Sequence, residues 1–463
     1  MAREYFVQVA YLLASGLFIL GLKGMGSAET ARRGMFLAEA GMLLAVIGTL
    51  LQAQILRYEW ILVGLAVGSA VGVAISLRVP MTAMPQRIAA SHAFGALAAT
   101  LVGVAEFLGS QGHGEVIEHP KMAALGFEVM FGSLTVTGSI MAFGKLQEIL
   151  PSAPITYRGQ NATNIALFLA TVGLYVYLIV VPDAAWAFYA MIGLGLAIGI
   201  LIVLPIGGAD MPVVISLLNS YAGLASSATG FAIGNNVLII AGALDGASGF
   251  ILSILMSRAM NRSFTNVLFG AFGSAPAAAA LKGGTALPVR EVTIEDAAVQ
   301  LAFARRVIVV PGYGLAVAQA QHQVRELAQQ VERQGGEVLY AIHPVAGRMP
   351  GHMNVLLAEA NVPYDALRDM DEINPDFPEC DVSLVVGAND VVNPAARTDQ
   401  SSPIFGMPIL DVDKSKSIIV MKRSMNPGFA GIENALFYDP KTAMLFGDAK
   451  SSLSKLVAHM KGL

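Results

Sequence analysis

Long apolar runs, separated by short segments that carry most of the charges, fill the first 260 residues of the chain. Nine of these runs approach or reach the roughly 20 residues that a helix needs to cross a hydrocarbon core. They span residues 5–22, 34–51, 60–77, 88–108, 122–143, 165–181, 184–204, 211–233 and 237–256. Several are rich in glycine and alanine, which lets helices approach closely in lipid. The pattern predicts a multi-span α-helical membrane bundle over residues 1–260.

The pattern changes in the last third of the chain, where short β-branched runs alternate with amphipathic ones. Strands are predicted at residues 307–310, 338–342, 382–386, 418–421 and 443–446, and helices at 291–305, 315–334, 354–360 and 364–370. This alternation is typical of a parallel sheet covered by helices. We therefore expect a C-terminal α/β Rossmann-like domain over residues 291–463. Residues 261–290, rich in Gly, Ser, Ala and Pro, are expected to form a flexible linker.

Composition narrows the class of protein further. Hydrophobic residues make up 55% of the chain and charged residues only 13%, against about 25% charged in a typical soluble domain. The net charge of −4 argues against a nucleic-acid partner. The single cysteine, Cys380, excludes an internal disulfide framework and a multi-cysteine metal site, so no metal is expected. No cleavable signal peptide is evident, and the first run is expected to remain as a span.

The basic residues between the predicted spans indicate an orientation. If the chain starts outside, nine lysines and arginines fall on the inner side and three on the outer side. Positive charges accumulate on the cytoplasmic side of membrane proteins. The C-terminal domain is therefore expected in the cytoplasm.

Three polar side chains stand well inside predicted spans, where burial in lipid is costly. His92 lies among alanines, and an imidazole can take up and release a proton near neutral pH. Asn219 lies in the middle of a span that begins just after Asp210. His92 and Asn219 are equally compatible with a proton path and with a structural hydrogen bond between helices. Asp245 lies inside the ninth run, where an apolar residue is expected.

Two glutamates and one short motif in the spans have simpler interpretations. Glu106 and Glu128 are expected near helix ends, where a long side chain reaches headgroup water. The segment Thr171-Val-Gly-Leu-Tyr175 resembles a potassium filter, but it departs from that pattern after the glycine and lies inside an apolar span. We do not expect a channel filter there.

The predicted strands end in polar or glycine-rich segments, and ligands of open parallel sheets bind beyond these carboxyl ends. After the first strand, Gly312 and Gly314 match the first two glycines of a dinucleotide fingerprint, but Val317 replaces the third. Asp390 follows the third strand and is expected to face the same site, where it could sense the charge of a cofactor.

The second strand ends without the acidic residue that binds an NAD ribose, whereas a later strand ends in Lys422-Arg423-Ser424. Two cations and a hydroxyl suit a 2′-phosphate, which favours NADP(H) over NAD(H). A solvated basic strand end is the alternative interpretation of these three residues.

Longer blocks carry a family resemblance. GYGLAVAQAQ at 312–321, HPVAGRMPGHMNVLLAEA at 343–360, GAND at 387–390 and KRSMN at 422–426 resemble the beta subunit of proton-translocating NAD(P) transhydrogenase, as do GGADMPVVISLLNSY at 207–221 and AMNRS at 259–263. The resemblance covers essentially the whole chain.

The resemblance implies that the C-terminal domain binds NADP(H) in a reversed orientation, with the 2′-phosphate at Lys422, Arg423 and Ser424. The segment 428–431 would cover the cofactor, and the family usually has tyrosine where Phe429 stands. The residues expected to contact the cofactor are Gly312, Tyr313, Gly314, Ala316, Val317, Arg348, Met349, Pro350, Gly351, His352, Gly387, Ala388, Asn389, Asp390, Lys422, Arg423, Ser424, Asn426, Gly428, Phe429, Ala430, Gly431 and Asp448.

The resemblance also implies a partner and a coupled activity. An alpha subunit would carry NAD(H), and hydride would pass directly between the two nicotinamides with no side chain acting as chemical acid or base. His92, Asn219 and Asp210 match the proton path of the family. A dimer of alpha–beta units in the bacterial inner membrane is expected. The alternatives are a transporter or channel gated by a nucleotide-sensing domain, and a haem or flavin oxidoreductase, which the lack of paired histidines within the spans disfavours.

Overall fold

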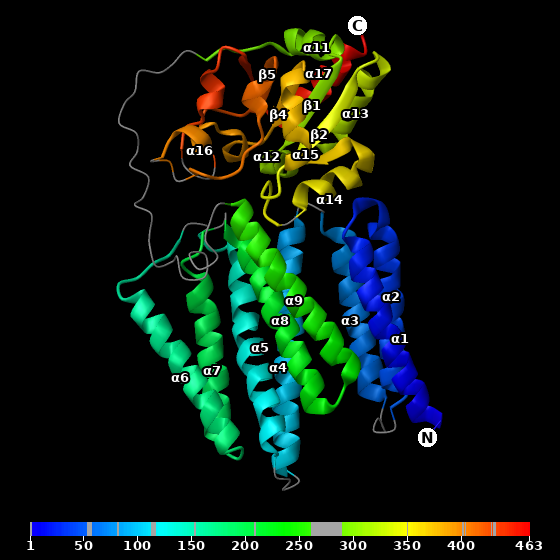
Figure 1. Ribbon diagram of the computed structural model, residues 1–463, viewed down its shortest axis with the longest axis vertical. Helices are drawn as coiled ribbons and strands as arrows, with labels where there is room; N and C mark the ends of the chain where they lie inside the picture. Colours follow the sequence, from blue (N-terminus) through cyan, green and yellow to red (C-terminus); the bar gives the residue numbers. More distant parts are fainter. Residues whose placement is uncertain are drawn as a thin grey trace. The chain divides into compact units, whose positions relative to one another are not determined.

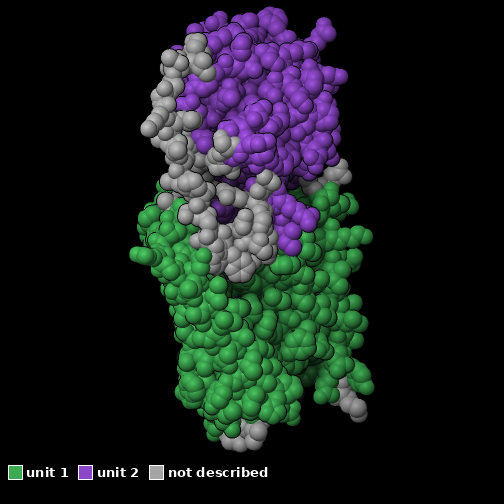
Figure 2. Space-filling view, turned by 60° about the vertical axis from the view of Figure 1, so that its left-hand side comes forward, with its two compact units in different colours: residues 1–207, 213–253 green, residues 208–212, 254–463 purple. Residues whose placement is uncertain are grey.

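The computed structural model describes residues 2–52, 58–80, 83–112, 117–151, 154–207, 210–260, 289–349, 351–400, 402, 404–426, 428 and 432–463. The chain divides into two compact units, coloured separately in Figure 2. One comprises Met1–Gly207 and Val213–Ser253, and the other Gly208–Pro212 and Ile254–Leu463. Most of the predicted linker, residues 261–288, lies outside the described residues.

The first unit is built from long helices (Figure 1). In the described part of the chain, nine helices are long and apolar enough to cross a membrane. They are α1 (Ala2–Met25), α2 (Ala28–Leu50), α3 (Glu59–Arg78), α4 (Met84–Gly112), α5 (His119–Leu146), α6 (Gln160–Val180), α7 (Ala185–Val203), α8 (Met211–Ile233) and α9 (Asn236–Ala259). Each coincides with one predicted run, so the predicted membrane bundle is confirmed.

Burial separates the inner helices of this unit from the outer ones. In the most apolar 18-residue stretch of each helix, 67% of the residues of α5 and 72% of those of α8 are buried inside the protein, whereas none of those of α3 is buried. Small residues make the tightest contacts, as expected for helices that associate in lipid. A Cβ added at Gly223 of α8 would lie 2.3 Å from the backbone nitrogen of Gly246 in α9. The backbones of α8 and α9 therefore touch.

The second unit contains a six-stranded parallel sheet in the order β3-β2-β1-β4-β5-β6, which confirms the predicted α/β domain. The strands are β1 (Arg306–Pro311), β2 (Glu337–Ile342), β3 (Leu367–Asp369), β4 (Val382–Val386), β5 (Ser417–Lys422) and β6 (Thr442–Phe446). The order reverses between β1 and β4, and sheets of this type bind ligands beyond that point.

Both faces of the sheet are covered, which explains the nearly continuous apolar runs of its strands. Val307 and Val309 contribute to one core with helices α11 (Ile294–Ala302), α13 (Gln321–Arg333), α14 (His352–Glu359) and α17 (Ala449–Met460). Ile308 and Val310 contribute to the other core, under the short helices η5 (Asn374–Glu379), η7 (Val412–Lys414) and η8 (Ala435–Tyr438). The helix α17 was not predicted.

Two predicted helices differ from the structure. The helix predicted at 315–334 is two helices, α12 (Tyr313–Ala318) and α13, because Gln319 adopts a left-handed backbone with φ of 48°. The helix predicted at 364–370 is wrong, since β3 occupies its centre between the short helices η4 (Tyr364–Ala366) and α15 (Met370–Ile373). This edge strand has only 3 residues, none of them buried, so its pattern carries no strand period.

Residues before α11 extend the sheet beyond β6. The amide of Met444 donates to the carbonyl of Arg290 at 2.7 Å, and the amide of Val292 donates to the carbonyl of Met444 at 3.0 Å. Glu291 and Met444 form an isolated parallel bridge. Val289 and Arg290, placed in the predicted linker, thus already belong to the folded unit.

Candidate functional site

Glycines join the segment after β1 to the segment after β4. The amides of Gly312 and Gly314 donate to the carbonyls of Val386 and Gly387, at 2.9 and 3.0 Å. A Cβ at Gly312 would lie 2.3 Å from the carbonyl oxygen of Gly387, and a Cβ at Gly387 would lie 2.4 Å from the amide nitrogen of Leu315. Gly387 also has a left-handed φ of 69°. The three glycines form a backbone contact, here called the glycine interlock, that side chains would force apart.

The segment after β2 packs against the same turn. The guanidinium of Arg348 lies over the ring of Tyr313, 4.4 Å from its centre. The backbone amide of Arg348 donates to Nδ1 of His352 at 3.1 Å, so Nε2 carries the hydrogen of the neutral ring. Burial, together with the charge of Arg348, lowers the pKa of His352 to about 4. Within the described residues, Nε2 of His352 is buried without a hydrogen-bond partner.

His343, at the end of β2, has a structural role. Its Nε2 lies 2.8 Å from the carbonyl oxygen of Pro408, and its Nδ1 accepts from the amide of Val345 at 3.2 Å. Burial lowers its pKa to about 4, so the ring is neutral. With both ring nitrogens engaged, His343 ties the end of β2 to the segment that carries Pro408.

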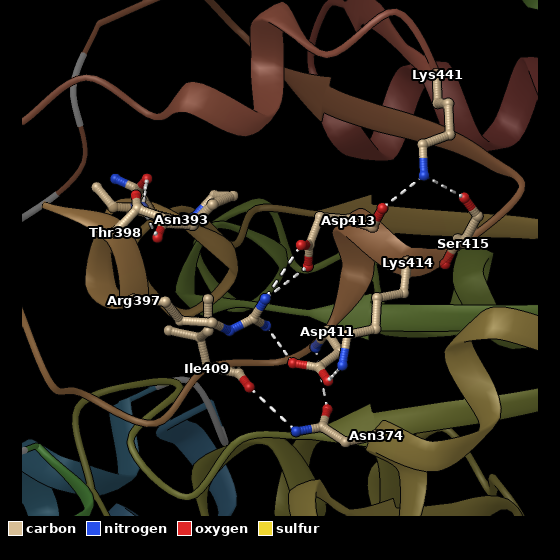
Figure 3. A network of polar contacts seen from close by, with 12 residues as sticks. Asn374, Asn393, Arg397, Thr398, Ile409, Asp411, Asp413, Lys414, Ser415 and Lys441 are labelled. Carbon is tan, nitrogen blue, oxygen red and sulfur yellow. Dashed lines mark hydrogen bonds and ion pairs between the residues drawn. The ribbon is translucent and has the colours of Figure 1, made fainter.

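A polar network holds the next part of that segment (Figure 3). Arg397 contacts the carboxylates of Asp411 and Asp413, the latter at 3.1 Å. Asn374 donates to the carbonyl of Ile409 at 3.1 Å and accepts from the amide of Asp411 at 3.0 Å. The network fixes the connection between β4 and β5.

The segment after β4 meets the one after β5. A Cβ at Gly428 would lie 2.2 Å from Nδ2 of Asn389 and 2.7 Å from Oδ1 of Asp390. Asn434 donates to the backbone carbonyl and to the side-chain oxygen of Asn389, at 2.9 and 3.1 Å. Nδ2 of Asn389 is buried with no partner in the described part of the chain. Asn434 therefore fixes the far end of the segment that begins at Gly428.

The basic residues lie at the ends of β5 and β6. Lys422 donates to the carbonyl of Asn426 at 2.7 Å and lies 4.8 Å from the ring centre of Phe437. Burial lowers the pKa of Lys422, and the charge of Asp390 partly offsets that effect. Arg423 is exposed and contacts Asp448, the N-cap of α17, at 3.6 Å.

The structure thus brings the predicted cofactor residues to one edge of the sheet, in contacts that run from β2 through β1, β4 and β5 to β6. Ala316, Met349 and Ala388 are buried behind this edge, whereas the side chain of Val317 is 51% exposed. Gly351 has a left-handed φ of 67°, and Ser424 accepts from the amide of Asn426 at 3.4 Å. The remaining predicted residues, Pro350, Phe429, Ala430 and Gly431, lie outside the described residues.

In the first unit, the three polar residues singled out from the spans lie together. The imidazole of His92 in α4 lies within hydrogen-bond reach of the side chain of Asn219 in α8. Asn219 donates from Nδ2 to Oδ1 of Asp245 in α9 at 2.9 Å. Asp245, which had no assigned role, is therefore the third member of this group. Asp210 directly precedes α8 and belongs to the second unit.

The prediction for Glu128 is wrong. Its side chain is 0% exposed, and it stands about 14 Å along α5 from His119 at 1.5 Å per residue, too deep to reach headgroup water. Gly103 of α4 makes room for its carboxyl group, since a Cβ there would lie 3.1 Å from Cδ of Glu128. Glu106, nearer the end of α4, forms an ion pair with Lys121 at 2.5 Å.

Sequence reasoning missed Asn434, and it noted Asp245, the partner of Asn219, without assigning it a role. Asn434 is buried at 2% exposure, but nothing in the sequence distinguishes it from other loop asparagines. Asp245 did carry a signal, because a carboxylate inside a span marks a functional position with a partner nearby. No group of three metal-ligating side chains occurs among the described residues.

Comparison with known proteins identifies the family to which the chain belongs. The family model described as NAD(P) transhydrogenase beta subunit matches residues 7–459. Two curated relatives from Rhodospirillum rubrum, one of them from a specified strain, are named NAD(P) transhydrogenase subunit beta. Each is 48% identical over 456 residues, which cover 97% of this chain and 98% of the relative. The chain therefore belongs to the NAD(P) transhydrogenase beta subunit family.

Proposed function

We propose that this chain is the NADP(H)-binding, membrane-spanning subunit of a proton-translocating NAD(P) transhydrogenase. Residues 1–260 would form the proton-translocating domain, 261–290 a flexible linker and 291–463 the cytoplasmic NADP(H)-binding domain. The excess of lysine and arginine on one side of the spans supports this orientation in a bacterial inner membrane. The family name, subunit beta, implies an alpha subunit as partner, and we propose that NAD(H) binds there.

One observation carries the nucleotide part of the proposal, namely the continuous row of contacts along the carboxyl edge of the sheet. At its centre, the glycine interlock joins the segments after β1 and β4 at the start of α12, next to the sheet edge beyond which ligands bind in folds of this type. The buried Nε2 of His352 and Nδ2 of Asn389 are donors that lack partners among the described residues. These donors suit the amide and phosphate oxygens of a dinucleotide.

The basic end of the row supports NADP(H) rather than NAD(H). Lys422 is half-buried and held by Asn426, so its ammonium group is positioned before a ligand arrives. Arg423 is exposed and makes a long contact of 3.6 Å with Asp448, which a phosphate can replace with a bidentate pair. The hydroxyl of Ser424 would add a third donor.

NADP(H), when bound, supplies the nicotinamide that accepts or releases the hydride. The side chains of this chain would bind and orient it, and none acts as a chemical acid or base in that transfer. The stacked pair of Tyr313 and Arg348 would hold one side of the site, and the segment beginning at Gly428, fixed beyond by Asn434, would cover it. In the membrane domain, His92 would take up and release the translocated proton beside Asn219.

The test uses the full chain with its alpha partner in sealed vesicles. We expect hydride transfer from NADH to an NADP⁺ analogue with a shifted absorbance, accelerated by a gradient that drives protons toward the side of the membrane that carries the C-terminal domain. A pH-sensitive dye inside the vesicles should report proton movement at the same time. Absence of transfer, or transfer at a rate that ignores the gradient, would refute the proposed function.

A further inference from the structure

Asp245 carries a carboxylate at a depth where membrane helices rarely do. It is the tenth residue of α9, about 14 Å from the nearer helix end at 1.5 Å per residue. Its surface is exposed in this chain. A carboxylate at such a depth is costly and indicates a function exercised with a specific partner. The partner is Asn219, whose Nδ2 donates to Oδ1 of Asp245 at 2.9 Å.

The backbones around this hydrogen bond hold Asn219 in one place. Ser220 of α8 donates from its hydroxyl to the carbonyl of Gly246 in α9 at 2.7 Å. One turn further along α9, a Cβ at Gly249 would lie 2.9 Å from Nδ2 of Asn219. The carboxamide therefore lies against bare backbone on one side and against Asp245 at its amino end. It has little room to move as a whole, but rotation by half a turn would exchange its oxygen and nitrogen.

The chemistry of the three groups decides between these two orientations. An ionised carboxylate only accepts hydrogen bonds, so it selects the orientation with the NH₂ group toward Asp245. The carbonyl oxygen of Asn219 then remains for His92, and a carbonyl oxygen also only accepts. The nitrogen of His92 that faces Asn219 must consequently carry a hydrogen, whether the ring is neutral or charged.

We propose that Asp245 is a positioning residue for the proton path: it fixes the orientation of the Asn219 carboxamide and thereby the tautomer of His92. The ring nitrogen beside Asn219 keeps its hydrogen, and the translocated proton is exchanged at the other ring nitrogen. Nδ1 of His92 is buried with no hydrogen-bond partner in the described part of the chain, as expected of a ring whose second contact is not a fixed protein group. This inference rests on the proposed function for the use of the proton, but its structural half stands independently.

The test compares two variants of Asp245 with a matched control. Asp245→Val removes the acceptor, and Asp245→Asn keeps a hydrogen bond but allows either orientation of the Asn219 carboxamide. Glu39→Val likewise replaces a carboxylate with valine, at an exposed position in the middle of α2, remote in sequence from the three residues. All chains are prepared with ¹⁵N-labelled histidine, reconstituted with the alpha subunit, and measured for coupled turnover. The His92 signals in the solid-state NMR spectrum are assigned with His92→Gln.

We expect a single neutral tautomer of His92 in the parent chain and in Glu39→Val. Asp245→Val should show a mixture of His92 tautomers, and its rate of coupled turnover should fall at least about tenfold. This loss is smaller than the full effect of removing a positioned proton-transfer group. Asp245→Asn should lie between the parent chain and Asp245→Val, both in the proportion of the two His92 tautomers and in the rate of coupled turnover. NADP(H) binding should stay unchanged in every variant.

Asp245→Val with the parent tautomer would overturn the inference, even if turnover fell, because a merely structural role would produce that result. If Asp245→Val does not fold, the same criterion applies to Asp245→Asn. Failure of the proposed function has a different signature, since the parent chain would then show no proton-coupled turnover while the tautomer measurement still tests the role of Asp245.

Discussion

Replacing Gly387 with alanine probes whether the glycine interlock holds the segments after β1 and β4 together. The left-handed backbone of Gly387, with φ of 69°, costs an alanine about 1–2 kcal/mol. The new Cβ would also lie 2.4 Å from the amide nitrogen of Leu315, whereas ordinary contact begins at 3.4 Å, so the two segments must separate by about 1 Å. Such overpacking against backbone adds about 1–3 kcal/mol. The sum predicts a loss of about 2–5 kcal/mol in the free energy of unfolding.

Gly335→Ala is the matched control. Gly335 follows α13, has a φ of 90°, and a Cβ there would have nothing within 4 Å. This variant should therefore lose only the backbone contribution, about 1–2 kcal/mol. The difference between the two variants isolates the steric contact between the segments after β1 and β4.

Cys380 provides an assay specific to the C-terminal unit in the full-length protein. It is the only cysteine of the chain and is 0% exposed, so a thiol-reactive fluorophore labels it when this unit unfolds. The midpoint of thermal labelling should fall by roughly 4–20 °C in Gly387→Ala and by a few degrees in Gly335→Ala. NADP(H) affinity should fall at least about tenfold in Gly387→Ala only. Equal midpoints for the two variants, or unchanged NADP(H) affinity in Gly387→Ala, would refute the reasoning.

Four further outcomes are expected. Lys422→Ala should weaken NADP(H) binding by about 1.5–3 kcal/mol, measured by calorimetry, and leave the affinity of the same site for NAD(H) unchanged. Equal losses for both nucleotides at this site would contradict a 2′-phosphate contact. His92→Ala should abolish coupled turnover while NADP(H) binding survives, and turnover that persists would contradict its role. Because burial lowers the pKa of His343 to about 4, the unfolded chain binds the proton first as pH falls below about 6.5, and this histidine alone should lower the free energy of unfolding by about 2 kcal/mol by pH 5. His343→Gln should flatten the acid side of the Cys380 labelling profile, and an unchanged slope would contradict this assignment. Arg397→Ala should cost only about 1 kcal/mol, because this guanidinium is partly exposed, and a larger shift of the same midpoint would show that its network does more than fix a connection.

The sequence alone predicted the features that depend on the spacing of apolar residues and on the residues at the ends of strands. Within the described residues, apolar runs of helix length predicted every span, and β-branched runs predicted five of the six strands. The segments that follow the strands predicted which residues share one edge, since parallel strands all end on the same side. Gly312 and Gly387 illustrate this: each was selected by its place after a strand, and the structure joins them directly.

Features set by contacts across the fold could not be predicted in this way. Gln319 adopts a left-handed backbone that glycine and asparagine usually occupy, so its identity gave no sign of a helix break. The short strand β3 is defined by its pairing with β2 rather than by its own pattern. The burial of the Glu128 carboxyl group depends on the space that Gly103 leaves in a neighbouring helix, and a sequence does not reveal that pairing.

The pairing of Arg290 and Val292 with β6 has a mechanical consequence. The two hydrogen bonds to Met444 connect parallel chains, so a force applied at Val289 along the strand direction loads both bonds at once. Hydrogen bonds loaded in this shear geometry share the force, whereas hydrogen bonds pulled open from one end break one after another. A force along that direction would therefore move the whole sheet as one body, and the residues paired with β6 would not peel away.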